Sequence, residues 1–288
     1  MNPRPLLIFV LILALTSMAC SVTINLPESE AKTGPTVVDE ILVEVPVTGE
    51  STHLSLAFGA GKLKITPGVG DLLVSGNATY NISDFKPLVS VAGNRVRIEQ
   101  GELELRGLPT FSSNLVNEWD LQLGQAPVSL HITAGAYEGS YELGGLAIED
   151  LEISDGAADS RLSFSEPNLV EMSTLRYTTG ASSVHLEGLA NANFVDMYFR
   201  SGAGSYTLDF SGELQREASV TIESGLGSVR IVLPPGTAGT VKFEGSLSNV
   251  DISGEWERRG NEYVHSGDAP QITFLVKLGV GNLELRSQ

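Results

Sequence analysis

A short glycine-containing string recurs along this chain at intervals of just over twenty residues. It reads Gly-Ala-Gly-Lys-Leu-Lys-Ile at residues 59–65 and Gly-Val-Gly-Asn-Leu-Glu-Leu at residues 279–285. Between them, six related units begin 21, 24, 22, 23 and 20 residues apart. A repeat of this period predicts stacked supersecondary units that share one continuous core. The six units begin at Gly135, Gly156, Gly180, Gly202, Gly225 and Gly245.

Each unit has the content of two short strands and two turns. From residue 41 onward, apolar and polar residues alternate in runs of up to about eight, and most runs are bounded by turn residues. No segment has the pattern of an amphipathic helix. We therefore predict an all-β fold, a parallel β-solenoid with coils of about 22 residues. A β-sandwich of hairpins is the alternative, but its turns would not be expected to repeat the same residues at the same offset.

The chain divides into four expected regions. Residues 1–19 read as a signal peptide and residues 20–38 as a polar tether. Residues 39–112 form a smaller β region, and residues 113–288 form the solenoid repeat. A segment rich in proline, serine and asparagine at 109–118 marks the boundary. An insertion at about 256–270 interrupts the repeat before Gly279.

The N-terminal segment predicts an address outside the cytoplasm. Arg4 precedes an apolar run at 6–15, and the only cysteine, Cys20, follows Ala19. This arrangement resembles a bacterial lipoprotein signal, although Ser17 stands where leucine is favoured. The resemblance implies lipidation of Cys20 and attachment to the extracytoplasmic face of the membrane. Plain secretion and an uncleaved anchor are the alternatives.

Composition and motifs exclude several classes of function. The net charge is −17, from 18 basic and 35 acidic residues, so nucleic acid is not an expected partner. A single cysteine provides neither an internal disulfide nor a cysteine-based zinc site. The four histidines form no metal-ligand pair and read as surface residues. The acidic stretch 149–159 does not match a calcium loop. We expect no cofactor, no metal and no enzymatic activity.

The register of the repeat separates inward from outward positions. Residues four and six positions after the first glycine are mostly apolar and should form the core, whereas odd offsets should face solvent. Offsets five and seven then bring an acidic row beside a weakly basic row, a possible face for a cation-bearing or carbohydrate ligand. The plainer interpretation is a solvated face that suppresses edge-to-edge aggregation. The residues of this candidate face are Glu142, Arg161, His185, Glu187 and Asp209.

The insertion carries the second candidate site. Trp256, Arg258, Arg259 and Tyr263 lie within eight residues of one another. If exposed, they could stack on sugars or dock a partner. The favoured interpretation is instead a hairpin that caps one end of the solenoid, because terminal repeats must shield the open core.

The chain resembles the bacterial toast-rack family. The resemblance is carried by the glycine units, by Asn-Glu-Trp-Asp-Leu at 117–121, by Phe-Ser-Glu-Pro-Asn at 164–168 and by Phe-Ser-Gly at 210–212. This is a cell-envelope domain of unknown function, related to adhesin-type domains and to the C-terminal domain of Lia-type envelope-stress regulators. The resemblance implies a right-handed β-solenoid without established catalytic residues.

These features together favour a surface-anchored, non-enzymatic lipoprotein that acts as an adhesin or as an envelope interaction scaffold. Its partner would be an envelope protein or a glycan. The alternatives are an extracellular β-helix that binds or cleaves polysaccharide and a component of an envelope-stress sensor.

Overall fold

The chain divides into two compact units. A computed structural model describes residues 29–30, 33–47, 50–101, 109–110 and 115–288. In the smaller unit, residues 1–32 and 104–114, strand β1 (Ser29–Glu30) pairs in parallel with β7 (Pro109–Thr110). The expected signal peptide, Cys20 and most of the tether lie outside the described residues. The larger unit, residues 33–103 and 115–288, is all-β.

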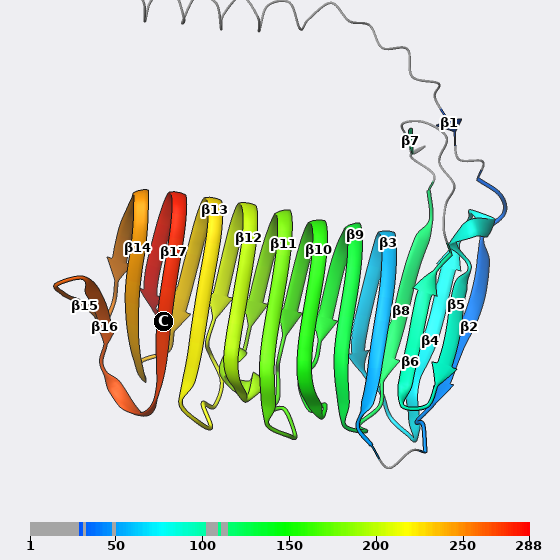
Figure 1. Cartoon of the computed structure of the whole chain (residues 1–288), viewed down its shortest axis with the longest axis horizontal. Coiled ribbons are helices and arrows are strands. Elements are labelled where there is room, and N and C mark those ends of the chain that lie inside the picture. The colour runs from blue at the N-terminus through cyan, green and yellow to red at the C-terminus, as the bar shows by residue number, and fades with distance from the viewer. Residues whose placement is uncertain (1–28, 31–32, 48–49, 102–108, 111–114) are drawn as a thin grey trace, which may run out of the picture. The chain divides into compact units, whose positions relative to one another are not determined.

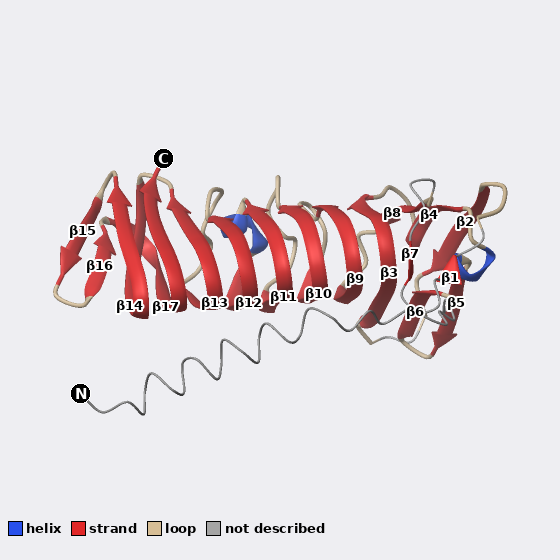
Figure 2. Cartoon of the chain, turned by 90° about the horizontal axis from the view of Figure 1, so that it is seen from above, coloured by secondary structure: helices blue, strands red, loops and turns tan. Residues whose placement is uncertain are grey.

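In the described residues, eight long strands form the body of the larger unit, and Figures 1 and 2 show them stacked side by side. Each pairs in parallel with its neighbour in the sheet, in the order β3, β9, β10, β11, β12, β13, β17, β14. Neither helical segment in the described part of the chain, the 3-10 turns η2 (Ser83–Phe85) and η3 (Leu189–Ala192), could reach across a bilayer. The bounds of the long strands are Thr52–Pro67 (β3), Val128–Glu142 (β9), Ile148–Ser163 (β10), Met172–Glu187 (β11), Phe194–Asp209 (β12), Ala218–Leu233 (β13), Gly236–Ser253 (β14) and Gly267–Ser287 (β17).

The long strands bend at a corner partway along their length (Figure 1). The inward direction of the side chains changes phase at the repeat glycine. In β11, Tyr177 and Thr179 are buried, the next two residues Gly180 and Ala181 are both exposed, and Ser182 is buried again. Strict alternation would keep the same parity throughout. Two successive outward residues instead let both halves of the strand direct their side chains into one core.

The predicted inward rows after the glycine are confirmed. Side chains four and six positions after the first glycine are at most 1% exposed in four of the units. Paired residues in adjacent strands lie 21, 24, 22 and 23 positions apart, as the glycines do. The buried pairs are Leu63 and Ile65, Tyr206 and Leu208, Val229 and Ile231, and Leu283 and Leu285.

The last units do not follow sequence order, and here the prediction was wrong. Strand β17 lies between β13 and β14 and pairs in parallel with both. The unit at Gly279 therefore follows the unit at Gly225, and the unit near Gly245 lies beyond it. Its anchor is also displaced by one residue. Gly245 pairs with Leu278, and Val250 and Ile252 pair with the inward Leu283 and Leu285, so Ser246 occupies the position of the first glycine.

At the other end of the stack, the two halves of β3 pair with different strands. Its first half pairs with β6 (Arg95–Gln100), which pairs with β5 (Pro87–Ala92). Its second half pairs with β8 (Asn117–Leu123), followed by β4 (Leu72–Tyr80) and β2 (Val37–Glu44). Strands on both sides of residue 113 therefore belong to one sheet and one compact unit.

Candidate functional site

The corner gives the stack two outer faces. We call the outward side chains before the repeat glycines the upstream face, and those after the glycines the downstream face. All five residues of the candidate ligand face lie on the downstream face. Register places Arg161 opposite His185, and Ser163 between Glu142 and Glu187. These side chains therefore share one surface, and their role in binding a ligand stays a prediction.

Most of the five are engaged in local contacts. Glu142 accepts hydrogen bonds from Gly144 N at 2.8 Å, from Ser163 Oγ at 2.7 Å and from Ser165 N and Oγ at 3.0 Å. Burial opposes ionisation of Glu142, but the hydrogen bonds outweigh it and lower the pKa of this carboxyl. Glu142 thus acts as a turn-capping residue.

The other members differ in their freedom to bind. His185 Nε2 lies 2.7 Å from Glu187 Oε1, and Asp209 Oδ1 accepts a hydrogen bond from Ser211 N at 2.8 Å. Arg161 is exposed, and its guanidinium forms no hydrogen bond or ion pair with any residue that the structure describes. Glu142 and Glu187 border a shared hollow of about 460 Å³, but Arg161 does not line it.

The insertion is a hairpin whose aromatic side chains are buried, and not an exposed aromatic loop. Trp256 and Tyr263 are only 5% and 8% exposed, which contradicts the interpretation of these rings as a stacking surface. Strands β15 (Trp256–Arg259) and β16 (Glu262–His265) pair with each other, and β16 pairs with β14 at the end of the sheet. The hairpin thus occupies the position expected of a cap. Among its charged residues, Arg259 pairs with Glu257 at 3.0 Å and Arg258 lies over the Tyr263 ring.

The prediction of a surface position was also wrong for one histidine. His265 is 1% exposed, although a surface position was expected. Its ring lies against Trp256, with centroids 5.0 Å apart, and its nitrogens lie 2.7 Å from Thr237 O and 2.8 Å from Ser287 Oγ. The two polar contacts satisfy the imidazole inside the cap, so His265 joins the hairpin to the C-terminal end of β17.

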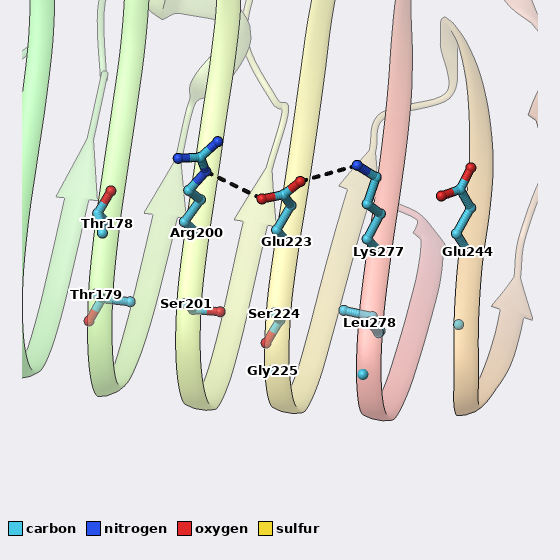
Figure 3. A pocket seen from close by; sticks show the side chains of 12 residues that line it. Thr178, Thr179, Arg200, Ser201, Glu223, Ser224, Gly225, Glu244, Lys277 and Leu278 are labelled. Carbon is cyan, nitrogen blue, oxygen red and sulfur yellow. Dashed lines mark hydrogen bonds and ion pairs between the residues drawn. The ribbon is translucent and has the colours of Figure 1, made fainter.

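The upstream face carries an alternating charged row that the sequence interpretation missed (Figure 3). Register aligns Arg200, Glu223, Lys277 and Glu244 on four adjacent strands, and we call this set the charged row. The Glu223 carboxylate forms two ion pairs: Oε2 lies 3.3 Å from Arg200 Nε, and Oε1 lies 3.2 Å from Lys277 Nζ. The row lines a hollow of about 670 Å³, together with Thr178 and the corner residues below it.

A second upstream hollow lies nearer the strand starts. It has a volume of about 410 Å³ and is lined by His53, His131, Glu152 and Arg176 among others. His131 Nδ1 lies 3.5 Å from Glu152 Oε2, and Arg176 lies 5.3 Å from the centroid of the Tyr198 ring. In the described part of the chain, no three His, Cys, Asp or Glu side chains converge as metal ligands.

The upstream face was missed for a physical reason. The prediction extended only forward from each glycine, and outward positions there have odd offsets. Before the glycine, the corner reverses the phase, and outward residues have even offsets. The signal was nevertheless present, because Arg200, Glu223 and Lys277 each stand two residues before a repeat glycine. Counting backward would have revealed the charged row.

The acidic stretch 149–159 does not converge on one point. Glu152 is an upstream residue, whereas Asp155 lies at the corner and meets the core. Asp155 Oδ2 accepts hydrogen bonds from Tyr177 OH at 2.8 Å and Tyr137 OH at 3.3 Å, and Asp155 Oδ1 accepts one from Thr179 Oγ1. This carboxylate therefore organises a polar network inside the corner.

The network predicts loss of stability at alkaline pH. Burial, followed by the charge of Asp155, raises the pKa of Tyr137 to about 12 from 10.0. Below pH 10 the phenol is protonated in both the folded and the unfolded chain. Between about pH 10 and 12 the unfolded chain releases its proton first, so the free energy of unfolding falls as pH rises. The contribution of Tyr137 is about 3 kcal/mol, because its pKa rises by about two units at about 1.4 kcal/mol each.

Urea unfolding from pH 9 to 12 measures this effect. Burial also raises the pKa of Tyr177 and Tyr141, so the whole network should steepen the decline. The variant Tyr137→Phe should lose stability less steeply over the same interval. An unfolding free energy that stays level from pH 9 to 11.5 would contradict the prediction.

Comparison with known proteins identifies the family. Residues 29–173, just over half of the chain, match the model described as the N-terminal domain of toast_rack, DUF2154. The chain therefore belongs to the toast-rack family, as its sequence resemblance indicated. No curated protein matches it.

Solved structures of low sequence identity also align with the chain. A proposed cell adhesion protein from Clostridium sporogenes is 21% identical, with a TM-score of 0.49 over 88% of this chain and 100% of that chain. A proposed adhesin from Bacteroides fragilis is 10% identical, with a TM-score of 0.32 over 89% and 99%. A proposed lipid binding protein from Parabacteroides distasonis is 11% identical, with a TM-score of 0.33 over 89% and 99%. At these identities and scores the likeness supports no statement on function.

Proposed function

We propose that this member of the toast-rack family is a non-enzymatic binding scaffold of the bacterial cell envelope, acting in adhesion or in the assembly of envelope proteins. Rigid, in-register strands present outward side chains in straight rows, spaced by about 4.8 Å from strand to strand. Stacked repeats generally use such extended surfaces for binding. The binding surface in this proposal is the upstream face.

The charged row is the observation that carries the proposal. Its Arg200, Glu223 and Lys277 side chains are 59%, 37% and 45% exposed. Exposed ion pairs of this kind contribute only about 0–1 kcal/mol to stability. A row of such charges along a hollow is therefore better suited to recognising an extended, charged partner than to holding the fold together.

The proposal also includes a lipid anchor at Cys20 and the hand and coil length of the solenoid. We propose that Cys20 is lipidated and holds the protein on the extracytoplasmic face of the membrane. We also propose that the strands form a right-handed solenoid of about 22 residues per coil, the hand that parallel crossover connections favour. Mass spectrometry of the mature N-terminus tests the anchor, since acyl chains on Cys20 are expected and an unmodified Cys20 would overturn it.

Charge reversal on the two faces tests the binding surface. We expect the double variant Arg200→Glu, Lys277→Glu to weaken co-sedimentation of the full chain with envelope fractions by about tenfold or more. The matched control is Arg161→Glu, Arg230→Glu on the downstream face, which changes the same net charge. Equal loss in both variants would indicate general charge repulsion and would refute a role for the charged row.

Polysaccharide binding or cleavage is the second candidate. The observation that favours it is the downstream hollow bordered by Glu142 and Glu187, since paired carboxylates can serve sugar chemistry. Glycan-array and lyase assays of the full chain separate the two proposals. Cleavage that is abolished by Glu187→Gln would replace the non-enzymatic scaffold with an enzyme. An envelope-stress sensor, the third candidate, would act through the same protein contacts as the scaffold.

A further inference from the structure

Strand β5 is an edge strand without a described partner on its outer side. It pairs antiparallel with β6, and no other strand in the described residues pairs with it. An edge of this kind presents unpaired N–H and C=O groups to any strand that approaches it. Figure 2 shows β5 and β6 at the end of the stack opposite the β15–β16 hairpin.

The apolar rows of the core end uncovered at β5. Val91 pairs with Val96, and Val89 pairs with Ile98. Directly opposed residues in an antiparallel pair share one face, so Val89 and Val91 continue the inward rows. Val96 and Ile98 are 1% and 0% exposed, whereas Val89 and Val91 are 46% and 57% exposed. Among the residues that the structure describes, no element therefore covers the core at this edge.

Other edge strands of the unit are protected by charge, and β5 is not. Strand β2 carries Asp39, Glu40 and Glu44, and β15 carries Glu257, Arg258 and Arg259. Charged side chains on an edge discourage pairing with another chain. The sequence of β5, Pro-Leu-Val-Ser-Val-Ala, has no charged residue. This edge is thus the one best suited to accept a further strand.

We propose that β5 pairs antiparallel with β5 of a second copy of this chain, with Ser90 of each copy at the two-fold axis. In that register Val89 of one copy lies opposite Val91 of the other, so both inward rows continue into inward valines. Leu88 lies opposite Ala92, and Pro87, which has no N–H to donate, stays outside the ladder. The strand is therefore complementary to itself on its inward side.

The outward side of β5 brings no charged side chains of the two copies directly opposite each other under the same symmetry. On the outward side, Leu88 pairs with Glu99 and Ala92 pairs with Arg95 of β6. Opposing Leu88 of one copy to Ala92 of the other produces two rows that each run from a glutamate to an arginine. Both rows follow from the two-fold axis, as an isologous interface requires. A second copy thus fits this edge through its apolar rows, and no charged side chain on β5 opposes the pairing.

Sedimentation velocity of the full chain tests the proposal. We expect a concentration-dependent dimer in the native chain and a dissociation constant about 100-fold higher for Val91→Lys, because two lysines enter each interface. The matched control is Leu226→Lys, since Leu226 is as exposed as Val91 but lies at a strand corner. Equal thermal midpoints of the two variants would show that folding is unaffected. A native chain that remains monomeric, or equal weakening by both variants, would overturn the proposal.

Disulfide trapping locates the axis. Ser90→Cys should form a covalent dimer under mild oxidation, because residues opposed in an antiparallel pair have Cα atoms about 4.5–5.5 Å apart, within disulfide reach. Ser219→Cys, exposed on β13 in the middle of the stack, is the control, and both variants retain Cys20. Failure of Ser90→Cys to cross-link above this control would refute the register. It would be the result expected if another segment or a partner peptide covered β5.

Discussion

Replacing Gly227 by alanine is expected to lower the free energy of unfolding by about 3 to 5 kcal/mol. Gly227 has φ +147°, a conformation that L residues rarely adopt. A Cβ atom on Gly227 would lie 2.0 Å from Gly204 O on the neighbouring strand. Relief of this overlap requires β12 and β13 to separate locally, which would break both backbone pairing and core contacts.

The glycine column makes this position unusually sensitive. Gly204, Gly227 and Gly281 lie opposite one another on β12, β13 and β17. Cβ atoms on Gly204 and Gly281 would meet backbone oxygens at 1.8 Å and 1.7 Å. Each carbonyl is thus accommodated by the absence of a side chain on the next strand. We infer that the column sets the close approach of the three strands at the corner.

Urea unfolding of Gly227→Ala measures the loss, with Gly70→Ala as the control. Gly70 also has a positive φ, +103°, but a Cβ atom on Gly70 would meet no other atom within 4 Å. Gly70→Ala should therefore lower the free energy of unfolding only by the cost of holding alanine at a positive φ, about 1 to 3 kcal/mol. If Gly227→Ala were no more destabilising than Gly70→Ala, close packing between neighbouring corners would not be the cause.

Replacing Asn168 by alanine is expected to cost about 3 kcal/mol. The side chain is 3% exposed and lies in the return segment between β10 and β11. Its Oδ1 accepts from Ile148 N at 2.9 Å, and its Nδ2 donates to Ile148 O and Val170 O, both at 2.8 Å. Truncation removes the Asn168 partner of Ile148 N and Ile148 O, whereas Val170 O keeps a hydrogen bond from Asn193 Nδ2 at 2.9 Å. Each buried backbone group left unsatisfied costs about 1–3 kcal/mol, less any gain from relaxation or water.

Two variants separate hydrogen bonding from volume at this site. Asn168→Asp retains the shape and the acceptor but removes the two donors, so it should also destabilise the fold at neutral pH. Asn249→Ala, at an exposed asparagine bonded only to Asp251 in the described residues, should change stability by less than about 0.5 kcal/mol. A small effect of Asn168→Ala in thermal or urea unfolding would show that water replaces the side chain.

The candidate surfaces show how far sequence reasoning extended. Arg161 and His185 were placed side by side correctly, because both follow a glycine within the same local strand segment. The charged row was missed because its residues precede the glycine, across the change of phase. Trp256 was a candidate for an exposed partner loop, but pairing of β16 with β14 buries it. The first error concerns local geometry, and the second concerns a contact between separate strands.

The sequence by itself determined the repeating cross-section of this protein. Alternation after each glycine specifies which side chains enter the core, and the glycines mark the corners, because both properties depend on neighbouring residues alone. Only the tertiary structure decided the order of the last strands. Gly281 fits against Gly227, so β17 enters between β13 and β14, while β14, with Ser248 opposite Gly281, lies outside it. Such a choice depends on complementarity between strand corners that are 54 residues apart in the chain.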